Sequence, residues 1–391
     1  MDRALAGAGP VVASFVTFGL FWGSWAVMLF NIQHAFHFSD SDIGVLLSVA
    51  VAVAGLTGAV MGHLADRVGA RRLLWLSLLA WATLLVVLSL ARQRWTFAGA
   101  LVLVEVAGGC IDTAMNAEAT HRLVGNPGGL VRFHALFNAG ALLGAAAAGL
   151  LIGAGASFRW TWPGIAALAL LVALWAMRHD PGPISPPPAE PDHPAVPSHP
   201  LRRLRHEHLL VLLVVFALAE VTEGGVDTWG VLYLRNQLAT GVLLGAGAYV
   251  VGQAMAATTR GVGGTLLGRL SARRALIVGG CVAGGGILLE SLTHVAVLAA
   301  VGVMLGAGGA SLFWPLVMST VSKQTSQVVS AVGTFTAAGY IGWVAGAPVV
   351  GWVSQTYGPG RGLQLLAGAA GAVALASLAR AERSPGPVPT S

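Results

Sequence analysis

Three acidic residues within one apolar stretch are the residues best suited to chemistry. Glu220, Glu223 and Asp227 lie at positions i, i+3 and i+7 of the segment 207–233, a spacing that places them on one face of a helix. Carboxylates this close together in a low-dielectric setting repel one another, so we expect at least one to hold a proton. Glu220 and Glu223 are the proton-carrying candidates. Asp227 is a candidate substrate contact, with a solvated position near the segment's outer end as the alternative.

A second polar face lies in the segment 96–118. Asp112 and Asn116 are four residues apart and share a helical face, which makes Asp112 a third proton-carrying candidate and Asn116 a candidate substrate contact. The next segment opens with His134 and Asn138, again four residues apart, and we expect both near the substrate. For His134 two interpretations stay open: a proton relay with Asp112, or a structural hydrogen bond between the two helices.

The remaining candidates are one cation, one amide and two indoles. Arg260 shares a helical face with Gln253, and it could pair with an acid of 207–233, bind an anionic substrate or extend to the membrane surface. Trp25 and Trp314 offer aromatic faces that suit sugar rings and flat drugs alike, although such residues are more often packing or interfacial residues. Two further acids, Glu118 and Glu290, lie close to segment ends, where we expect them to be solvated.

The composition requires these groups to sit in a membrane. Of 391 residues, 55% are hydrophobic and 10% are charged, against the ~25% typical of soluble domains. The mean hydropathy is +0.75, which excludes both a soluble globule and a disordered chain. Twelve apolar stretches are long enough to span a bilayer. They are 10–32, 43–64, 72–91, 96–118, 130–154, 160–177, 207–233, 242–267, 272–290, 294–318, 327–354 and 360–380.

A proline-rich linker divides the twelve stretches into two sets of six. Residues 181–200 hold nine of the 18 prolines, a density that no helix tolerates. The sequence therefore predicts an N-terminal bundle over 1–180, a linker over 181–206 and a C-terminal bundle over 207–391. Of the 22 basic residues, 16 fall on the side of the linker and both termini, five on the other side, and Arg260 lies inside a span. This bias predicts cytoplasmic termini in an inner membrane.

A loop motif occurs twice, about 200 residues apart. The segment Gly62-His-Leu-Ala-Asp-Arg-Val-Gly-Ala-Arg-Arg72 follows the second stretch, and Gly268-Arg-Leu-Ser-Ala-Arg-Arg274 follows the eighth. The first copy resembles the loop motif of the major facilitator superfamily. That resemblance implies two pseudo-symmetric six-helix bundles, alternating access with substrate bound between them, and a cytoplasmic latch. The latch residues it implies are Asp66, Arg67, Gly69 and Arg71. Alternatively, Arg71 and Arg72 only mark topology, and because the second copy lacks the acid, we expect no symmetric second latch.

Two other stretches indicate a branch of that superfamily. Gly108-Gly-Cys-Ile-Asp-Thr-Ala-Met-Asn116 resembles the fucose-permease pattern, while Glu223-Gly-Gly-Val-Asp-Thr-Trp229 and Gly339-Tyr-Ile-Gly-Trp-Val-Ala-Gly-Ala-Pro348 resemble uncharacterised inner-membrane relatives of that permease. One departure matters: the fucose permease carries an acid in its first helix, and Trp25–Gln33 of this chain contains none. The sugar–proton scheme of that permease is therefore not transferable as a whole.

These observations predict a secondary transporter for a small organic solute, possibly a sugar, coupled to protons through Asp112, Glu220 and Glu223. Alternatives are a drug or metabolite efflux pump, an uncoupled facilitator and, in a different class, a membrane sensor that does not transport. Motifs of metalloproteases, serine hydrolases and P-loop enzymes are missing, so we expect no enzymatic activity, metal or cofactor. The expected partners are the solute, protons and the lipid bilayer. Nucleic acid is not expected, because the basic residues mark topology, and we expect a monomer.

Overall fold

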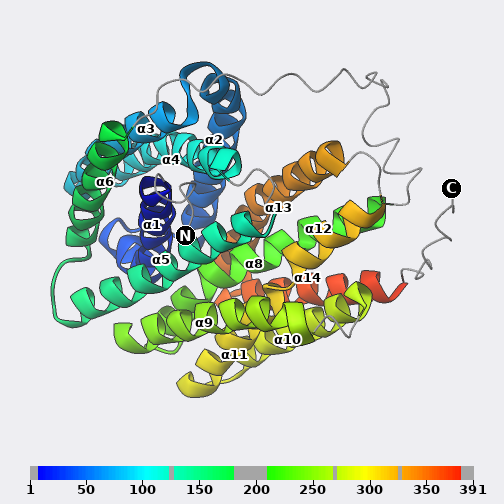
Figure 1. Ribbon diagram of the computed structural model, residues 1–391. Coiled ribbons are helices and arrows are strands. Elements are labelled where there is room, and N and C mark those ends of the chain that lie inside the picture. The colour runs from blue at the N-terminus through cyan, green and yellow to red at the C-terminus, as the bar shows by residue number, and fades with distance from the viewer. Residues whose placement is uncertain (1–7, 123–126, 180–208, 267–270, 325–327, 380–391) are drawn as a thin grey trace, which may run out of the picture.

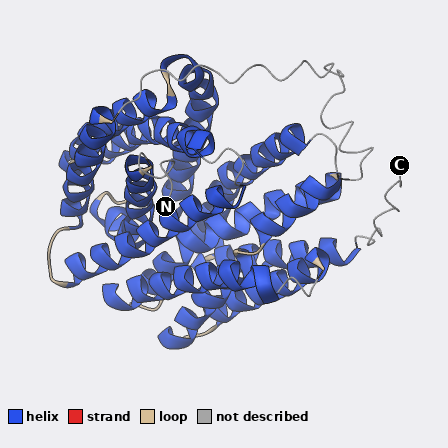
Figure 2. Cartoon of the chain, in the orientation of Figure 1, coloured by secondary structure: helices blue, strands red, loops and turns tan. Residues whose placement is uncertain are grey.

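A computed structural model describes residues 8–122, 127–179, 209–266, 271–324 and 328–379. Within these ranges every regular element is a helix (Figures 1 and 2). The predicted linker 181–206 lies outside the described residues, and so do the side chains of Asp66 and His134. The predicted all-helical membrane fold is confirmed, because ten of the described segments are long and apolar enough to cross a bilayer. Helix α8 (Leu210–Gln237), which carries the three acids, and helix α13 (Val328–Tyr357) run among them.

The helices form two sets in chain order. The first set, here the N-half, comprises α1 (Gly9–Ala35), α2 (Asp40–Val68), α3 (Ala70–Leu90), α4 (Arg94–Arg122), α5 (Pro127–Gly153), the 3₁₀ turn η1 (Phe158–Trp160) and α6 (Thr161–Arg178). The second set, here the C-half, comprises α8 (Leu210–Gln237), α9 (Val242–Leu266), α10 (Ala272–Leu292), α11 (Ala296–Ala310), α12 (Phe313–Gln324), α13 (Val328–Tyr357) and α14 (Pro359–Ala379).

One predicted span is divided in two. The stretch 294–318 was expected to form a single helix, but α11 ends at Ala310 and α12 begins at Phe313. Pro315 explains the break. Proline has no backbone N–H and fixes its own φ, so it is tolerated in the first turn of a helix but not in its interior. The chain therefore ends one helix and starts another in front of Pro315.

Local signals in the sequence define the connection from α1 through α2 to α3. Ser39 caps α2, because its hydroxyl accepts from the Asp42 N–H while the Asp42 carboxylate accepts from the Ser39 N–H. Gly69 joins α2 to α3 with a φ of 92°, a conformation that glycine adopts without a steric penalty. This turn places the expected latch residue Arg67 on the surface and directs Arg71 into the N-half.

Glycines bring α1 and α5 into backbone contact. The segment Gly140-Ala-Leu-Leu-Gly144 of α5 carries two glycines four residues apart, a spacing typical of a small-residue packing face, and this face lies against α1. A Cβ atom added at Gly140 would lie 2.2 Å from the Val16 carbonyl oxygen, and one at Gly144 would lie 2.1 Å from that of Leu20. No side chain larger than hydrogen fits at either position without displacing a helix backbone. The two helices therefore pack at a separation that only glycine allows at these positions.

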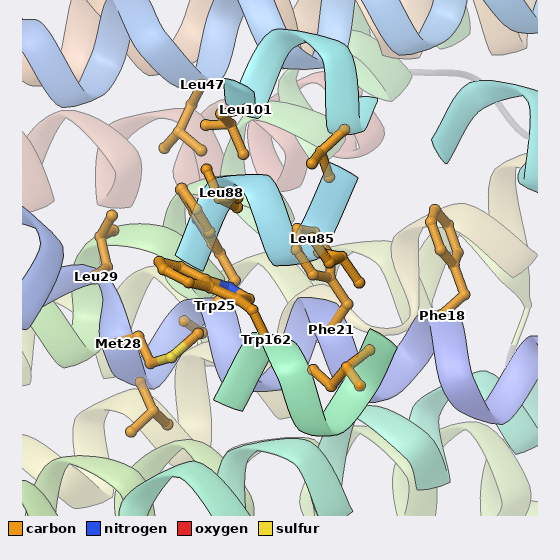
Figure 3. Packing of buried hydrophobic residues seen from close by; sticks show 14 of the residues in the cluster. Phe18, Phe21, Trp25, Met28, Leu29, Leu47, Leu85, Leu88, Leu101 and Trp162 are labelled. Carbon is orange, nitrogen blue, oxygen red and sulfur yellow. The ribbon is translucent and has the colours of Figure 1, made fainter. Parts of the chain in front are cut away.

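The core of the N-half contains Trp25. Its indole is 5% exposed, and it packs against Phe21 and stacks on Phe97 with ring centroids 6.5 Å apart (Figure 3). The ring was expected to face the substrate. Because it is enclosed by apolar side chains of its own half, we do not retain it as a substrate contact.

The two halves meet chiefly through α2 with α13, α5 with α9 and α1 with α8. Figure 1 shows α5 running beside α9. One hydrogen bond between described residues of the two halves runs from Ser48 of α2 to the Val344 carbonyl near the middle of α13. The others lie at one end, where α1 joins α2, α8 joins α9 and α13 joins α14. We call this the closed end. Arg235 of α8 donates to Asn31 at 2.6 Å and lies 3.8 Å from the centre of the Phe30 ring. Asn236 donates to Gln33 at 2.7 Å, and the Asp40 N–H donates to Gln355 at 3.2 Å.

Candidate functional site

The acids of α8 do not share one environment. Glu223 forms an ion pair with Arg260 of α9, and both side chains remain partly accessible, at 27% and 31% of their surface. The same guanidinium donates through Nε to the Ser311 carbonyl oxygen, at 3.0 Å. Arg260 thus binds both α8 and the break between α11 and α12. Of the three interpretations left open by the sequence, the structure shows the ion pair.

Asp227, one turn beyond Glu223, has a neutral partner. Gln253 of α9 donates to Asp227 Oδ1 at 2.8 Å, and the buried Tyr249 lies in the same cluster. A small cavity adjoins both carboxylates, and its lining comes from three helices of the C-half. The lining residues are Glu223, Val226, Asp227, Gln253, Ala256, Ala307 and Ala310. The structure therefore brings together Asp227, Gln253 and Arg260, the polar residues predicted in this half.

Glu220 lies at the boundary between the halves. It lines a cavity enclosed by α2, α8 and α13, with the indoles of Trp229 and Trp343 among the lining groups and Leu47 and Val51 on the N-half side. Its Oε1 atom is buried and has no hydrogen-bond partner among the described residues. The charges of Glu223 and Arg260 are close enough to act on the Glu220 carboxyl. Of the acids on this face, Glu220 therefore combines a buried, unpaired oxygen with a position at the interface.

The N-half contributes Asp112 and Asn116, as the spacing predicted. The Asn116 amide donates to Asp112 Oδ1 at 3.0 Å, so the two side chains form one polar group on α4. Asn138 of α5 is half-buried. Tyr340 of α13 connects this group to the C-half. Its ring lies against Gly55 of α2, and its hydroxyl lies within electrostatic range of both Asp112 and Glu220.

Two acids expected to be solvated are buried instead. Glu118 is 1% exposed and accepts from Arg71 Nη2 at 2.8 Å, and Arg71 is itself 1% exposed. Glu290 is 1% exposed, close to Gly230 and Gly302 of the neighbouring helices. Both predictions were wrong for the same reason. They used the distance to the end of a stretch, whereas burial depends on which helices pack over that end. A further buried acid, Glu105, lies two turns from Asp112 against Phe18.

The other predicted residues are placed as follows. Trp314 is 45% exposed at the start of α12, away from the described contacts of Arg260. Arg67 is exposed and Gly69 forms the α2–α3 turn. The roles of Asp66 and His134 stay predictions, because their side chains lie outside the described residues.

Sequence reasoning missed the backbone carbonyl that holds Arg260. The signal was present: Pro315 follows Ser311 by four residues, and a helical carbonyl bonds to the N–H four residues on. It also missed the side chains that join the halves at the closed end, because the partners Asn31 and Arg235 are about 200 residues apart. No local spacing relates such residues.

This arrangement is that of a helical membrane transporter. Its polar residues lie in one cavity between the two halves and in a second cavity within the C-half. The chain belongs to the Major Facilitator Superfamily, whose family model matches residues 11–347. It is 27% identical over 374 residues to the membrane protein MosC of Rhizobium meliloti, covering 94% of this chain and 88% of that protein. It is 25% identical over 349 residues to an uncharacterized MFS-type transporter of Yersinia pestis, covering 88% and 87% of the two chains.

Solved structures share the fold. The nucleoside transporter NupG superposes with a TM-score of 0.78 at 15% identity, covering 97% of this chain and 99% of that one. A bacterial homolog of the human lysosomal transporter Spinster, in an inward-facing and unoccupied conformation, gives a TM-score of 0.76 at 14% identity and covers 97% and 98%. At these identities the likeness establishes the fold, and the site has to be interpreted from this chain's own residues.

Proposed function

We propose that this protein moves a small organic solute across the inner membrane by alternating access, in exchange for or together with protons. The observation that carries the proposal is the Glu220 carboxyl, which has a buried, unpaired oxygen in a cavity between the two halves. An ionised carboxylate is costly in such a position, so the group favours a proton unless the cavity is wetted. A motion that alternately opens and closes the cavity would then bind and release that proton.

Asp112 is the second proton-carrying candidate, and Glu223 is the third. Asp112 has only the Asn116 amide as a described partner and lies near Tyr340, whereas Glu223 has the full positive charge of Arg260 beside it. The ion pair makes Glu223 the least suited of the three to take up a proton in this conformation. We therefore rank Glu220 and Asp112 before Glu223.

The polar side chains of the two halves suit a hydroxylated solute. Amide and carboxyl groups of Asn116, Asn138, Gln253 and Asp227 can donate to and accept from hydroxyls, and the cavity beside Glu220 offers indole faces. A sugar fits this set, as does the sugar part of a nucleoside, the solute named for one structural relative. This proposal extends the resemblance to the fucose permease and takes the transport unit to be a monomer.

We further propose that both termini are cytoplasmic, which makes the closed end periplasmic and the present conformation open toward the cytoplasm. Asp66, Arg67 and Gly69 would then form the latch only in the opposite conformation, while Arg71 keeps its buried partner Glu118. Single cysteines test the orientation in a chain whose Cys110 and Cys281 have been replaced. A cysteine at Gly241, which has open space around it, should react with an impermeant thiol reagent in intact cells. A cysteine at the exposed His179 should be protected, and the reverse pattern would contradict the orientation.

Transport in proteoliposomes tests the coupling. L-Fucose and uridine are offered with an imposed pH gradient, and uptake against the solute gradient is compared with solute exchange at equal pH. Glu220→Gln should abolish uphill uptake and keep exchange, because the amide cannot release a proton. Glu290→Gln, which changes a buried acid of α10, is the matched control and should keep both activities. Uphill uptake in Glu220→Gln would remove Glu220 from the mechanism.

A further inference from the structure

We propose that Pro315 is a positioning residue: by leaving the Ser311 carbonyl without a helical donor, it fixes the Arg260 guanidinium on Glu223 and withholds that charge from Glu220. The inference rests on the proposed proton-carrying role of Glu220. It concerns a residue that touches neither the acids nor the cavities, and acts through the backbone of another residue.

The backbone geometry comes first. In a continuous helix the carbonyl of Ser311 would accept from the N–H of residue 315, which is proline and has none. Ser311 is 1% exposed, so its carbonyl has little access to water. A buried acceptor left unpaired costs roughly 1–3 kcal/mol. Arg260 Nε satisfies it at 3.0 Å, which gives the arginine a fixed anchor inside the C-half.

The anchor determines the direction of the guanidinium. Nε and Nη2 lie on one edge of a rigid plane, and here Nε binds the Ser311 carbonyl while Nη2 binds Glu223. Two bonds from one planar edge leave the side chain little freedom to turn. Lysine at this position could not reproduce the arrangement, because its ammonium group has no fixed edge.

The direction of the guanidinium matters because three acids lie near Arg260. Glu220, Glu223 and Asp227 lie along one face of α8, and Arg260 is within electrostatic range of the two acids that it does not bind. The charged and titratable groups that face Glu220 are Glu223 on α8, Arg260 from α9 and Tyr340 from α13. An arginine free of its anchor could pair with Glu220, one turn away. Glu220 would then hold its negative charge and exchange no proton.

A second proline provides the matched control. Pro348 of α13 follows Val344 by four residues, so the Val344 carbonyl has no helical N–H to accept from. It accepts instead from the Ser48 hydroxyl of α2, at 2.6 Å. Pro315 and Pro348 thus each free a carbonyl that a side chain of another helix uses. One holds a charged side chain within the C-half, and the other joins the two halves. Substituting either proline by alanine makes the same covalent change, but only Pro315 acts on Arg260.

The experiment reads the protonation of Glu220 without a substrate. Dicyclohexylcarbodiimide attacks protonated carboxyl groups in apolar surroundings, and mass spectrometry of the reconstituted, full-length protein locates the adduct. We expect Glu220 to be modified in the wild-type chain. In Pro315→Ala the new N–H takes the Ser311 carbonyl, Arg260 is released, and modification of Glu220 should fall several-fold. Pro348→Ala should be modified at Glu220 as in the wild type.

A double variant separates this effect from a folding defect. If the released arginine suppresses the modification, Pro315→Ala combined with Arg260→Gln should restore it. Modification of Glu220 that is unchanged in Pro315→Ala, or a loss that persists in the double variant, would overturn the inference while leaving the proton role of Glu220 intact. Absence of modification at Glu220 in the wild-type chain over the whole pH range would instead contradict the proposed function itself.

Discussion

Each half of the molecule contains an arginine–glutamate pair, and the two pairs differ in almost every respect. In the N-half, Arg71 and Glu118 join α3 to α4 and are each 1% exposed. In the C-half, Arg260 and Glu223 join α9 to α8 beside a cavity and are each about 30% exposed. The first pair is enclosed by packed helices, and the second lies where water and solute can reach it.

The difference teaches that burial, and not the presence of opposite charges, separates a structural pair from a site. A buried pair is held in place because neither charge can be solvated alone, so it is poorly suited to change partners. When one member of a partly accessible pair is removed, water can solvate the charge that remains, so the cost is much smaller. The contrast between the two halves can be tested by removing one member of each pair.

The largest effect is expected in the N-half. Glu118→Ala removes the carboxylate that binds the buried Arg71, and removing one member of a buried pair typically costs about 3–5 kcal/mol. The unfolding temperature of the purified protein should fall markedly. Replacing both members by apolar residues, Arg71→Met with Glu118→Leu, should recover most of the loss. A Glu118→Ala protein as stable as the wild type would remove the distinction between the two pairs.

A smaller loss of stability is expected in the C-half. Glu223→Gln removes one charge of a partly accessible pair, for which the cost is about 1 kcal/mol or less. The measurement is the same thermal unfolding, made beside Glu118→Ala. Its consequence should appear in transport instead, because the Arg260 charge is then free to act on the neighbouring acids. If Glu223→Gln unfolds as readily as Glu118→Ala, the C-half pair is structural too.

The smallest change in overall stability is expected for Arg235, whose partners lie in the opposite half. Arg235→Gln loses the bond to Asn31 and the contact with the Phe30 ring, together worth roughly 1 kcal/mol. These contacts stabilise only the conformation in which the halves touch at the closed end. Without them, the fraction of molecules open at this end should rise about fivefold. Spin labels at the exposed Gln93 and His294 would report it as a longer distance. An unchanged distance distribution would show that Arg235 does not hold this end shut.

Local patterns in the sequence predicted the helices and one face of the site. Hydropathy located the spans, and the i, i+3, i+7 spacing placed the acids of α8 together, because both depend on residues close in the chain. Pairing of Arg260 with an acid of α8 was one of three interpretations that the sequence left open. Which acid it binds, and its bond to the Ser311 carbonyl, could not be predicted, because α8, α9 and the α11–α12 break meet only in the folded bundle. Glu118 was misplaced for a related reason: its position near the end of a stretch gave no information about Arg71, 47 residues away.

The bond between Ser48 and the Val344 carbonyl has a consequence for hydration. When the halves part at the closed end, that bond must break, and Pro348 ensures that α13 has no N–H with which to replace it. A carbonyl in this position has to be satisfied by water. Opening of this end therefore includes the entry of water between α2 and α13. A transport cycle limited by that step would slow as osmolytes lower the water activity, even with solute and proton gradients held constant.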